Sequence, residues 1–306
     1  MRIVFIGAGE IGVPTLQALL RSSEHRLTGV LTQLDKPVGR AQRIEPPPIK
    51  KALAGVKVPI LQPARIKDRQ PIEEVRALRP DAIVVMAYGQ ILPREVLEIP
   101  SVACLNLHAS LLPRWRGAAP TQAAIAAGDR ETGITAMYMA EELDTGDMLL
   151  QRKVDILPTD TGGSLHDRLA QVAPQALLEA LQMLGKDSAP RIPQDNALAT
   201  YAPKLTRDDG KIDWSEAAEV IERKIRAFNP WPGAFTILDG RNLKIFSASI
   251  VDLGGKPGEI LRSENELIIA AGKGALSLGE VQLEGKRRMS AREFSRGHAS
   301  ILRAAR

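Results

Sequence analysis

The sequence has 306 residues and a net charge of +5, with 44% hydrophobic and 25% charged side chains. This balance excludes an intrinsically disordered chain, and no apolar run approaches the roughly 20 residues of a membrane span, so we expect a cytoplasmic protein of two modest domains. The single cysteine, Cys104, excludes a disulfide framework and a thiolate metal cluster, and we expect no bound metal.

Short apolar runs alternate with helical patterns in the first half of the chain. We expect strands at residues 2–6, 27–32, 82–87, 102–108 and 134–139, and helices at 11–20, 71–78, 93–97 and 118–127. Continuous apolar strands separated by helices are typical of a parallel sheet covered on both faces. The sequence therefore predicts a doubly wound, mostly parallel α/β domain, closed by a leucine-rich helix over 164–184.

The pattern changes after this helix. Residues 185–204 lack periodicity and hold three prolines, which is typical of an interdomain linker. Asp213 and Glu216 then have the spacing of a capping box in front of an amphipathic helix. Five short strands follow, at 234–238, 242–247, 258–261, 267–270 and 275–283, and they predict a small β-barrel of the oligonucleotide-binding (OB-like) type. We place the first domain at 1–188, the linker at 189–206 and the barrel domain at 207–306.

Gly7, Gly9 and Gly12 follow the first predicted strand with the spacing of a dinucleotide-binding motif. Such a motif needs an acidic residue at the end of the second strand to bind the ribose. The chain reads VLTQL at 30–34, and the nearest acid is Asp35. We therefore expect the glycines to make a tight turn, and we do not expect NAD binding.

A dense group of polar residues lies in NLHASLLPRWRGAAP, residues 106–120. Asn106 and His108 are two apart at the carboxyl end of a predicted strand, so both side chains should point to the same side of the sheet. Ligands of open α/β sheets bind just outside that end of the strands. Asp144 lies in a Thr-Gly turn after the 134–139 strand, and it can reach His108 if the two strands are neighbours.

Three stretches of the sequence resemble the methionyl-tRNA formyltransferase family: HASLLPRWRGAAP at 108–120, AYGQILP at 87–93 and LDTGDML at 143–149. The segment KIDWSEAAEVIERKIRAFNPWP at 211–232 is similar to that family's C-terminal domain, so the resemblance covers nearly the whole chain. It implies a Rossmann-like formyltransferase domain, a 10-formyltetrahydrofolate co-substrate and an initiator methionyl-tRNA acceptor. It also implies an active site of Asn106, His108 and Asp144, with tetrahydrofolate contacts from Ser110, Leu111, Leu112 and Pro113.

The residue types suit formyl transfer. An amine that attacks a formamide carbonyl produces a tetrahedral oxyanion, which the Asn106 amide and a His108 N–H can stabilise. A proton must also pass from the attacking nitrogen to the departing folate nitrogen, and His108 and Asp144 can relay it. The amine is itself the nucleophile, so no covalent intermediate is required. Trp115 and Arg116 could line the folate site or contact the substrate, and the sequence does not distinguish these roles.

Positive charge is concentrated in two segments, 34–51 with five basic and two acidic residues and 281–306 with seven and two. In the family, a basic loop that corresponds to residues 34–51 enters the acceptor stem of the tRNA. The resemblance therefore implies that Arg40 and Arg43 contact tRNA. Family members often carry more lysines where this chain has Ala41, Gln42 and Ile44. Lys204 is a further candidate for a phosphate contact, and the C-terminal segment is either part of the same footprint or a solvated surface.

Other functions explain fewer of these features. A sugar-nucleotide formyltransferase or a formyltetrahydrofolate hydrolase would share the Asn, His and Asp set but needs no basic acceptor-stem loop. A glycinamide ribonucleotide formyltransferase should need no second domain. A non-catalytic RNA-binding protein would leave the polar set without a purpose, and a nicotinamide oxidoreductase would lack its ribose anchor. We therefore favour formylation of methionyl initiator tRNA by a monomeric enzyme.

Overall fold

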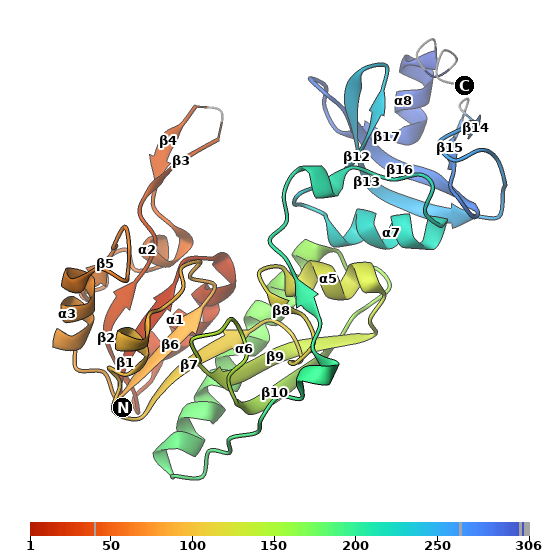
Figure 1. Ribbon diagram of the computed structural model, residues 1–306. Coiled ribbons are helices and arrows are strands. Elements are labelled where there is room, and N and C mark those ends of the chain that lie inside the picture. Colours follow the sequence, from red (N-terminus) through yellow and green to blue (C-terminus); the bar gives the residue numbers. More distant parts are fainter. Residues whose placement is uncertain (40, 263–264, 300–301, 303–306) are drawn as a thin grey trace. The chain divides into compact units, whose positions relative to one another are not determined.

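The computed structural model describes residues 1–39, 41–262, 265–299 and 302 (Figure 1). The chain folds into two compact units. The first comprises Met1–Gly117, Glu131–Asp155 and His166–Ala202, and the second comprises Ala118–Arg130, Ile156–Leu165 and Pro203–Arg306. Within the described residues, none of the helices combines the length and apolar character needed to cross a bilayer.

The first unit is built on a seven-stranded sheet with the order β10-β9-β7-β6-β1-β2-β5. Its strands are β1 (Arg2–Gly7), β2 (Arg26–Leu31), β5 (Ile60–Leu61), β6 (Ala82–Met86), β7 (Ala103–His108), β9 (Glu131–Tyr138) and β10 (Met148–Asp155). The five strands that are adjacent in the order β7-β6-β1-β2-β5 are parallel to one another, which confirms the mostly parallel sheet. β9 runs antiparallel to β7, and β10 runs antiparallel to β9. The sequence did not predict β10, because most of its residues alternate between exposed and half-buried and form no apolar run.

Helices cover both faces of this sheet. They are η1 (Glu10–Gly12), α1 (Val13–Arg21), α2 (Pro48–Ala52), α3 (Arg69–Ala77), α4 (Arg94–Leu97) and most of α6 (Gly162–Gly185). On one face, Val4 and Ile6 of β1 pack against buried side chains of α3 and α4. The intervening residue Phe5 points to the other face, where its ring lies against Gly12 at the start of α1. The doubly wound arrangement is thus confirmed.

The glycines after β1 allow close packing at the turn into α1. A Cβ on Gly7 would lie 2.7 Å from the carbonyl oxygen of Met86 in β6, and a Cβ on Gly12 would lie 3.2 Å from the ring of Phe5. Real Cβ atoms are rarely found so close to other heavy atoms. The packing of the turn against β1 and β6 therefore accounts for glycine at both positions.

A hairpin projects from the carboxyl end of β2. It consists of β3 (Lys36–Val38) and β4 (Arg43–Glu45), which pair in antiparallel fashion, and Figure 1 shows it extending away from the seven-stranded sheet. Its described residues from 36 to 44 are all exposed. At its base, the Asp35 carboxylate accepts hydrogen bonds from Gln62 Nε2 at 2.7 Å and from Lys50 Nζ at 2.8 and 2.9 Å. The hairpin is therefore attached by polar contacts rather than by a core of its own.

The segment predicted as a linker is bonded to the first unit. Ile192 forms an isolated antiparallel bridge with Met148. Further along, η2 (Asn196–Leu198) precedes β11 (Tyr201–Ala202), which pairs in parallel with β8 (Arg116–Gly117). Prolines and a lack of periodicity do not distinguish a free linker from an extended segment held by backbone hydrogen bonds.

The second unit contains an antiparallel sheet of six strands with the order β12-β13-β16-β15-β14, and β17 pairs with β16. The strands are β12 (Ala234–Leu238), β13 (Arg241–Val251), β14 (Ile260–Arg262), β15 (Leu267–Ala270), β16 (Ala275–Leu283) and β17 (Met289–Ser290). Among the residues that the structure describes, no strand pairing joins β12 to β14, so the barrel is half open. The expected small barrel is confirmed in this partly open form.

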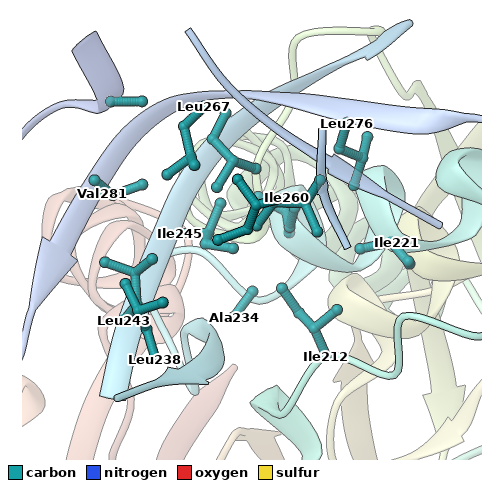
Figure 2. Packing of buried hydrophobic residues seen from close by; sticks show 14 of the residues in the cluster. Ile212, Ile221, Ala234, Leu238, Leu243, Ile245, Ile260, Leu267, Leu276 and Val281 are labelled. Atoms are coloured by element: carbon teal, nitrogen blue, oxygen red, sulfur yellow. The ribbon is translucent and has the colours of Figure 1, made fainter. Parts of the chain in front are cut away.

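Helices α5 (Pro120–Ala127), α7 (Ala218–Ala227) and α8 (Ala291–Gly297) also belong to the second unit, and α5 packs against α7. Figure 2 shows Ile221 of α7 beside the buried side chains of the barrel strands, among them Ile245, Ile260 and Leu276. All four side chains are at most 6% exposed. The apolar stripe predicted for this helix therefore faces the barrel core.

The capping box predicted at Asp213 and Glu216 is wrong. Asp213 instead accepts a hydrogen bond from the Ser215 amide at 2.9 Å, and α7 begins later, at Ala218, without a side-chain cap. A capping box is present on α8, where Ser290 and Glu293 bond each other's backbone amides. This helix was not predicted from the sequence.

Candidate active site

Three polar side chains meet at the carboxyl end of β7. Asn106 and His108 are alternate residues of this strand, and Asp144 lies in the loop between β9 and β10. Asn106 Nδ2 donates a hydrogen bond to Asp144 Oδ1 at 3.2 Å, and His108 Nδ1 lies 3.5 Å from Asp144 Oδ2. The side chains of His108 and Asp144 are only 6% and 7% exposed. The structure thus brings together the three residues singled out in the sequence.

His108 faces an acceptor on each side of its ring. Its Nε2 lies 2.8 Å from the carbonyl oxygen of Trp115. A carbonyl oxygen only accepts, so Nε2 carries the hydrogen of this bond, and in the neutral ring Nδ1 then has none. Nδ1 lies beside the Asp144 carboxylate. A proton that binds to Nδ1 is therefore stabilised by the negative charge of Asp144. Trp115 and Asp144 together orient the imidazole.

Asn106 retains an uncommitted donor. Its side-chain amide has two N–H groups, and one of them bonds Asp144. The other has no acceptor among the residues that the structure describes, and the side chain is half-buried rather than enclosed. Asn106 can therefore donate to an oxygen atom brought into the site.

The backbone also holds the Asp144 carboxylate. Asp144 has a left-handed conformation with φ of 55°, which aspartate tolerates better than most residues. Its Oδ2 accepts a hydrogen bond of 2.8 Å from the amide of Gly117 in β8. This donor was not predicted from the sequence, because a backbone amide leaves no residue pattern; the glycine in RWRGAAP is the one signal of it. The carboxylate is thus fixed from three directions, by Asn106, His108 and Gly117.

The SLLP segment folds back from β7 onto β9 and β10. Ser110 is fully buried, and its hydroxyl donates to the carbonyl oxygen of Arg114 at 2.6 Å. Thr135 of β9 bridges two backbone groups of the segment, since its hydroxyl donates to Ser110 O at 2.6 Å and accepts from Leu112 N at 3.1 Å. Gln151 of β10 donates to Leu112 O at 2.8 Å. These bonds fix the course of the backbone beside His108.

The four SLLP side chains differ in how much surface they present. Ser110 and Leu112 are buried, whereas Leu111 and Pro113 are half-buried. Leu111 lies over Gly133 of β9, where a Cβ would come within 2.6 Å of its Cδ2 atom. Leu111 and Pro113 therefore present apolar surface to a ligand. The folate contacts of all four residues stay predictions.

The residues predicted to bind tRNA lie in different parts of the chain. Arg43 is exposed on β4 and makes no ion pair with any residue that the structure describes. Arg40 lies outside the described residues. Lys204 is exposed in the second unit.

The acidic residues of the 34–51 segment neutralise its two C-terminal lysines. Asp35 pairs with Lys50 at 2.8 Å, and Glu45 of β4 pairs with Lys51. The positive charge left on the described part of the hairpin is therefore that of Lys36 and Arg43. Among the described residues, the Lys36 ammonium bonds a single group, the neutral amide oxygen of Gln33.

The described part of the chain has no clustered metal ligands, and its single thiol is buried. No group of three or more His, Cys, Asp or Glu side chains there is arranged to hold a metal ion. Cys104 lies on β7 within the apolar core, and its burial raises the pKa of the thiol to about 12. The thiol therefore stays protonated and poorly nucleophilic at neutral pH.

Family models match both parts of the chain. The model described as formyl transferase matches residues 1–181, and the model described as formyl transferase, C-terminal domain, matches residues 204–299. The first match includes the whole Asn106, His108 and Asp144 site. The fold and these matches together define the class: the protein is a formyltransferase.

Relatives define the family within this class. A methionyl-tRNA formyltransferase of Moorella thermoacetica is 44% identical over 304 residues, which cover 98% of this chain and 97% of the relative. One from Akkermansia muciniphila is 47% identical over 309 residues and covers 98% of each chain. The chain belongs to the methionyl-tRNA formyltransferase family.

Solved structures share the fold at low sequence identity. A sugar 3N-formyl transferase in the presence of dTDP and 5-N-formyl-THF has a TM-score of 0.68 at 18% identity, covering 94% of this chain and 99% of that one. A methionyl-tRNA formyltransferase of Clostridium thermocellum has a TM-score of 0.58 at 20% identity, covering 82% and 94%. HypX of Aquifex aeolicus, in complex with tetrahydrofolic acid, has a TM-score of 0.65 at 20% identity. The match covers 99% of this chain and 47% of HypX. These likenesses establish the fold.

Proposed function

We propose that this enzyme transfers the formyl group of 10-formyltetrahydrofolate to the α-amine of methionyl initiator tRNA. Relatives named for this acceptor are 44% and 47% identical over nearly the whole chain, whereas the sugar formyltransferase is 18% identical. Two structural neighbours were crystallised with folates, which supports a folate donor. The observation that carries the chemistry is the meeting of Asn106, His108 and Asp144 at one strand end.

Asn106 is the principal oxyanion donor in this proposal. Attack of the amine on the formyl carbon forms a carbon–nitrogen bond and places negative charge on the formyl oxygen. Asn106 has one N–H that is not bonded to a described residue, whereas the Nε2–H of His108 is held by Trp115 O. Removing a single donor of this kind typically costs about 10² to 10³ in rate. His108 assists as a second donor when Trp115 O releases Nε2.

His108 and Asp144 move the proton in this proposal. The amine nitrogen gains positive charge on attack and must lose a proton, and the folate nitrogen must gain one as its bond to the formyl carbon breaks. Nδ1 of His108 takes up the proton beside the Asp144 carboxylate, 3.5 Å away, and then returns it to the leaving nitrogen. General acid and base groups of this kind contribute about 10² to 10⁴-fold. The amine attacks directly, so no residue becomes covalently modified.

Leu111 and Pro113 supply the apolar wall of the folate site in this proposal, because they are the SLLP residues with exposed surface. Ser110 and Leu112 act through the loop backbone, which Thr135 and Gln151 hold beside His108. Catalysis belongs to residues 1–188, residues 189–206 connect the domains, and residues 207–306 aid tRNA binding. The enzyme acts as a cytoplasmic monomer.

Arg40 and Arg43 bind the phosphate backbone of the acceptor stem in this proposal, and Lys204 adds a contact from the second unit. The exposure of Arg43 on a projecting hairpin supports this role, as does the lack of an acidic partner for it in the described residues. Each phosphate contact releases counterions and makes the affinity depend on salt.

A comparison of acceptors tests the proposed function. The purified enzyme is incubated with 10-formyltetrahydrofolate and with methionyl initiator tRNA, methionyl elongator tRNA or a nucleotide-linked amino sugar. We expect formylation of the initiator tRNA, with weaker use of the elongator. Formylation of the sugar alone would indicate a sugar formyltransferase, and release of formate without any acceptor would indicate a hydrolase. Binding of tRNA with no transfer would indicate an RNA-binding protein.

A further inference from the structure

Gln194 connects the turn that carries Asp144 to a buried arginine. Its Nε2 donates to the carbonyl oxygens of Asp144 and Gly146, both at 2.8 Å. Its Oε1 accepts from Nε of Arg116 at 3.0 Å and from Nη2 of Arg116 at 2.8 Å. All these residues belong to the first unit. One side chain therefore uses both of its donors and its acceptor at the candidate active site.

The chemistry of the partners fixes the orientation of this amide. If the nitrogen and oxygen of Gln194 were exchanged, the amide donors would face the guanidinium donors of Arg116. The amide oxygen would at the same time face the two carbonyl oxygens, which only accept. Only the observed orientation satisfies all four hydrogen bonds.

Arg116 is placed to hold Gln194 firmly. It is 2% exposed, and it also donates to Oδ1 of Asn196 at 2.8 Å. Its acceptors among the described residues are thus side-chain amides, and a guanidinium keeps its charge when buried. Burying a charge without a charged partner costs stability. A costly group next to Gly117, whose amide bonds the Asp144 carboxylate, indicates a functional rather than a stabilising role.

The Asp144 turn needs such support because its backbone is strained. Asp144 has φ of 55°, and left-handed conformations outside glycine persist only when the surroundings hold them. The two hydrogen bonds from Gln194 bind the carbonyl groups on this turn. The carboxylate of the same residue, Asp144, contacts Asn106, His108 and Gly117. Movement of the turn would therefore move the carboxylate.

We propose that Gln194 is a positioning residue for formyl transfer and that Arg116 anchors it. Gln194 holds the backbone of residues 144–146 so that the Asp144 carboxylate stays beside the imidazole of His108, while Arg116 fixes Gln194 from the opposite side. The proposal rests on the catalytic role of Asp144 given above. It also assigns a function to a glutamine in a segment that otherwise connects the two units.

Two substitutions at Gln194 test the positioning role, and one of them keeps the contact with Arg116. Gln194→Leu removes all four hydrogen bonds, whereas Gln194→Glu retains the shape and pairs with Arg116 but directs an acceptor at the two carbonyl groups. We expect both variants to lower kcat by about 10²-fold, the typical cost of a misplacement near 1 Å. KM for both substrates should change little, and the pH profile of kcat should shift because the group beside His108 has moved. Gln70→Leu, at an exposed glutamine of α3, is the matched control.

A double-mutant cycle with Asp144→Asn completes the test. If Gln194 acts through Asp144, adding Gln194→Leu to Asp144→Asn should cause no further loss of kcat. If the losses of kcat from the two single substitutions multiply in the double variant, the positioning role of Gln194 is overturned. The proposed active site is not affected by that result. Wild-type activity of Asp144→Asn would instead overturn the proposed catalytic site itself. Wild-type kcat in Gln194→Glu, or losses in both Gln194 variants that merely follow a lowered Tm with an unchanged pH profile, would also overturn the inference.

Discussion

The amide of Gly117 donates a hydrogen bond of 2.8 Å to Oδ2 of Asp144, and Gly117 can do so because it has no side chain. Its φ is 117°, a value that other residues rarely adopt, and a Cβ there would lie 2.5 Å from the carbonyl oxygen of Ala202. The β8–β11 pairing places this oxygen, so it cannot move freely. The β8–β11 pairing thus links residues 201–202, through Gly117, to the Asp144 carboxylate.

Gly117→Ala should therefore lower kcat by about 10²-fold or more, because the pairing must open and the amide must leave Asp144. Steady-state kinetics measure this effect, and thermal unfolding measures the accompanying strain. Gly55→Ala is the matched control, since Gly55 has φ of 80° but open space around its Cβ position. Equal kinetic effects in the two variants would show that strain alone, and not the Asp144 contact, explains the loss.

Asn106→Ala should reduce the rate of formyl transfer by about 10² to 10³, since it removes the uncommitted oxyanion donor. Binding of tRNA and of folate should be retained, so the loss should lie in kcat. Single-turnover measurements with saturating substrates check this expectation. His108→Ala should likewise retain tRNA binding and lose transfer. Activity near that of the wild type in either variant would remove that residue from the mechanism.

Arg43→Ala should raise KM for tRNA without affecting folate binding. One phosphate contact fewer should also reduce the slope of log affinity against log salt concentration by about one. Filter binding or fluorescence titration over a range of salt concentrations measures the slope. Arg69→Ala, at an exposed arginine of α3, serves as the control. An unchanged slope in Arg43→Ala would rule out the phosphate contact.

Acid should loosen the base of the β3–β4 hairpin. Hydrogen bonds from Gln62 and then from Lys50 hold the pKa of Asp35 below its usual value. Since the folded pKa is the lower one, the stabilisation is present above the unfolded pKa and is lost as pH falls through the folded pKa. Hydrogen exchange of amides in residues 36–45, corrected for intrinsic rates, should increase below about pH 4. In Asp35→Asn this acid step should disappear, and an identical step in that variant would assign it to another group.

Much of the first unit could be predicted because its signals are local. β6 is a run of five buried apolar residues, and its pattern directly reports a strand covered on both faces. Asn106 and His108 could be paired because strand geometry places residues two apart on the same side. The direction of β9 could not be predicted, since a buried strand has the same residue pattern whether it runs parallel or antiparallel to its neighbour.

The missed contributors at the site are ones that leave no pattern. Gly117 acts through its backbone amide, and Gln194 lies in an aperiodic segment where nothing in the residue order distinguishes it. Spacing alone was also misleading at Asp213 and Glu216, because Asp213 bonds the nearby Ser215 rather than a helix amide. The contacts of Gly117 and Gln194 depend on which distant segments meet, and local sequence does not encode that.

The β3–β4 hairpin has a consequence for how this enzyme family can diversify. Its described residues from 36 to 44 are all exposed, so the core of the sheet contains none of them, and the contacts of Asp35 with Lys50 and Gln62 lie outside this range. The hairpin can therefore be exchanged without replacing a core residue of the sheet. Insertion, deletion or recombination there can change the length and sequence of the hairpin without replacing Asn106, His108 or Asp144.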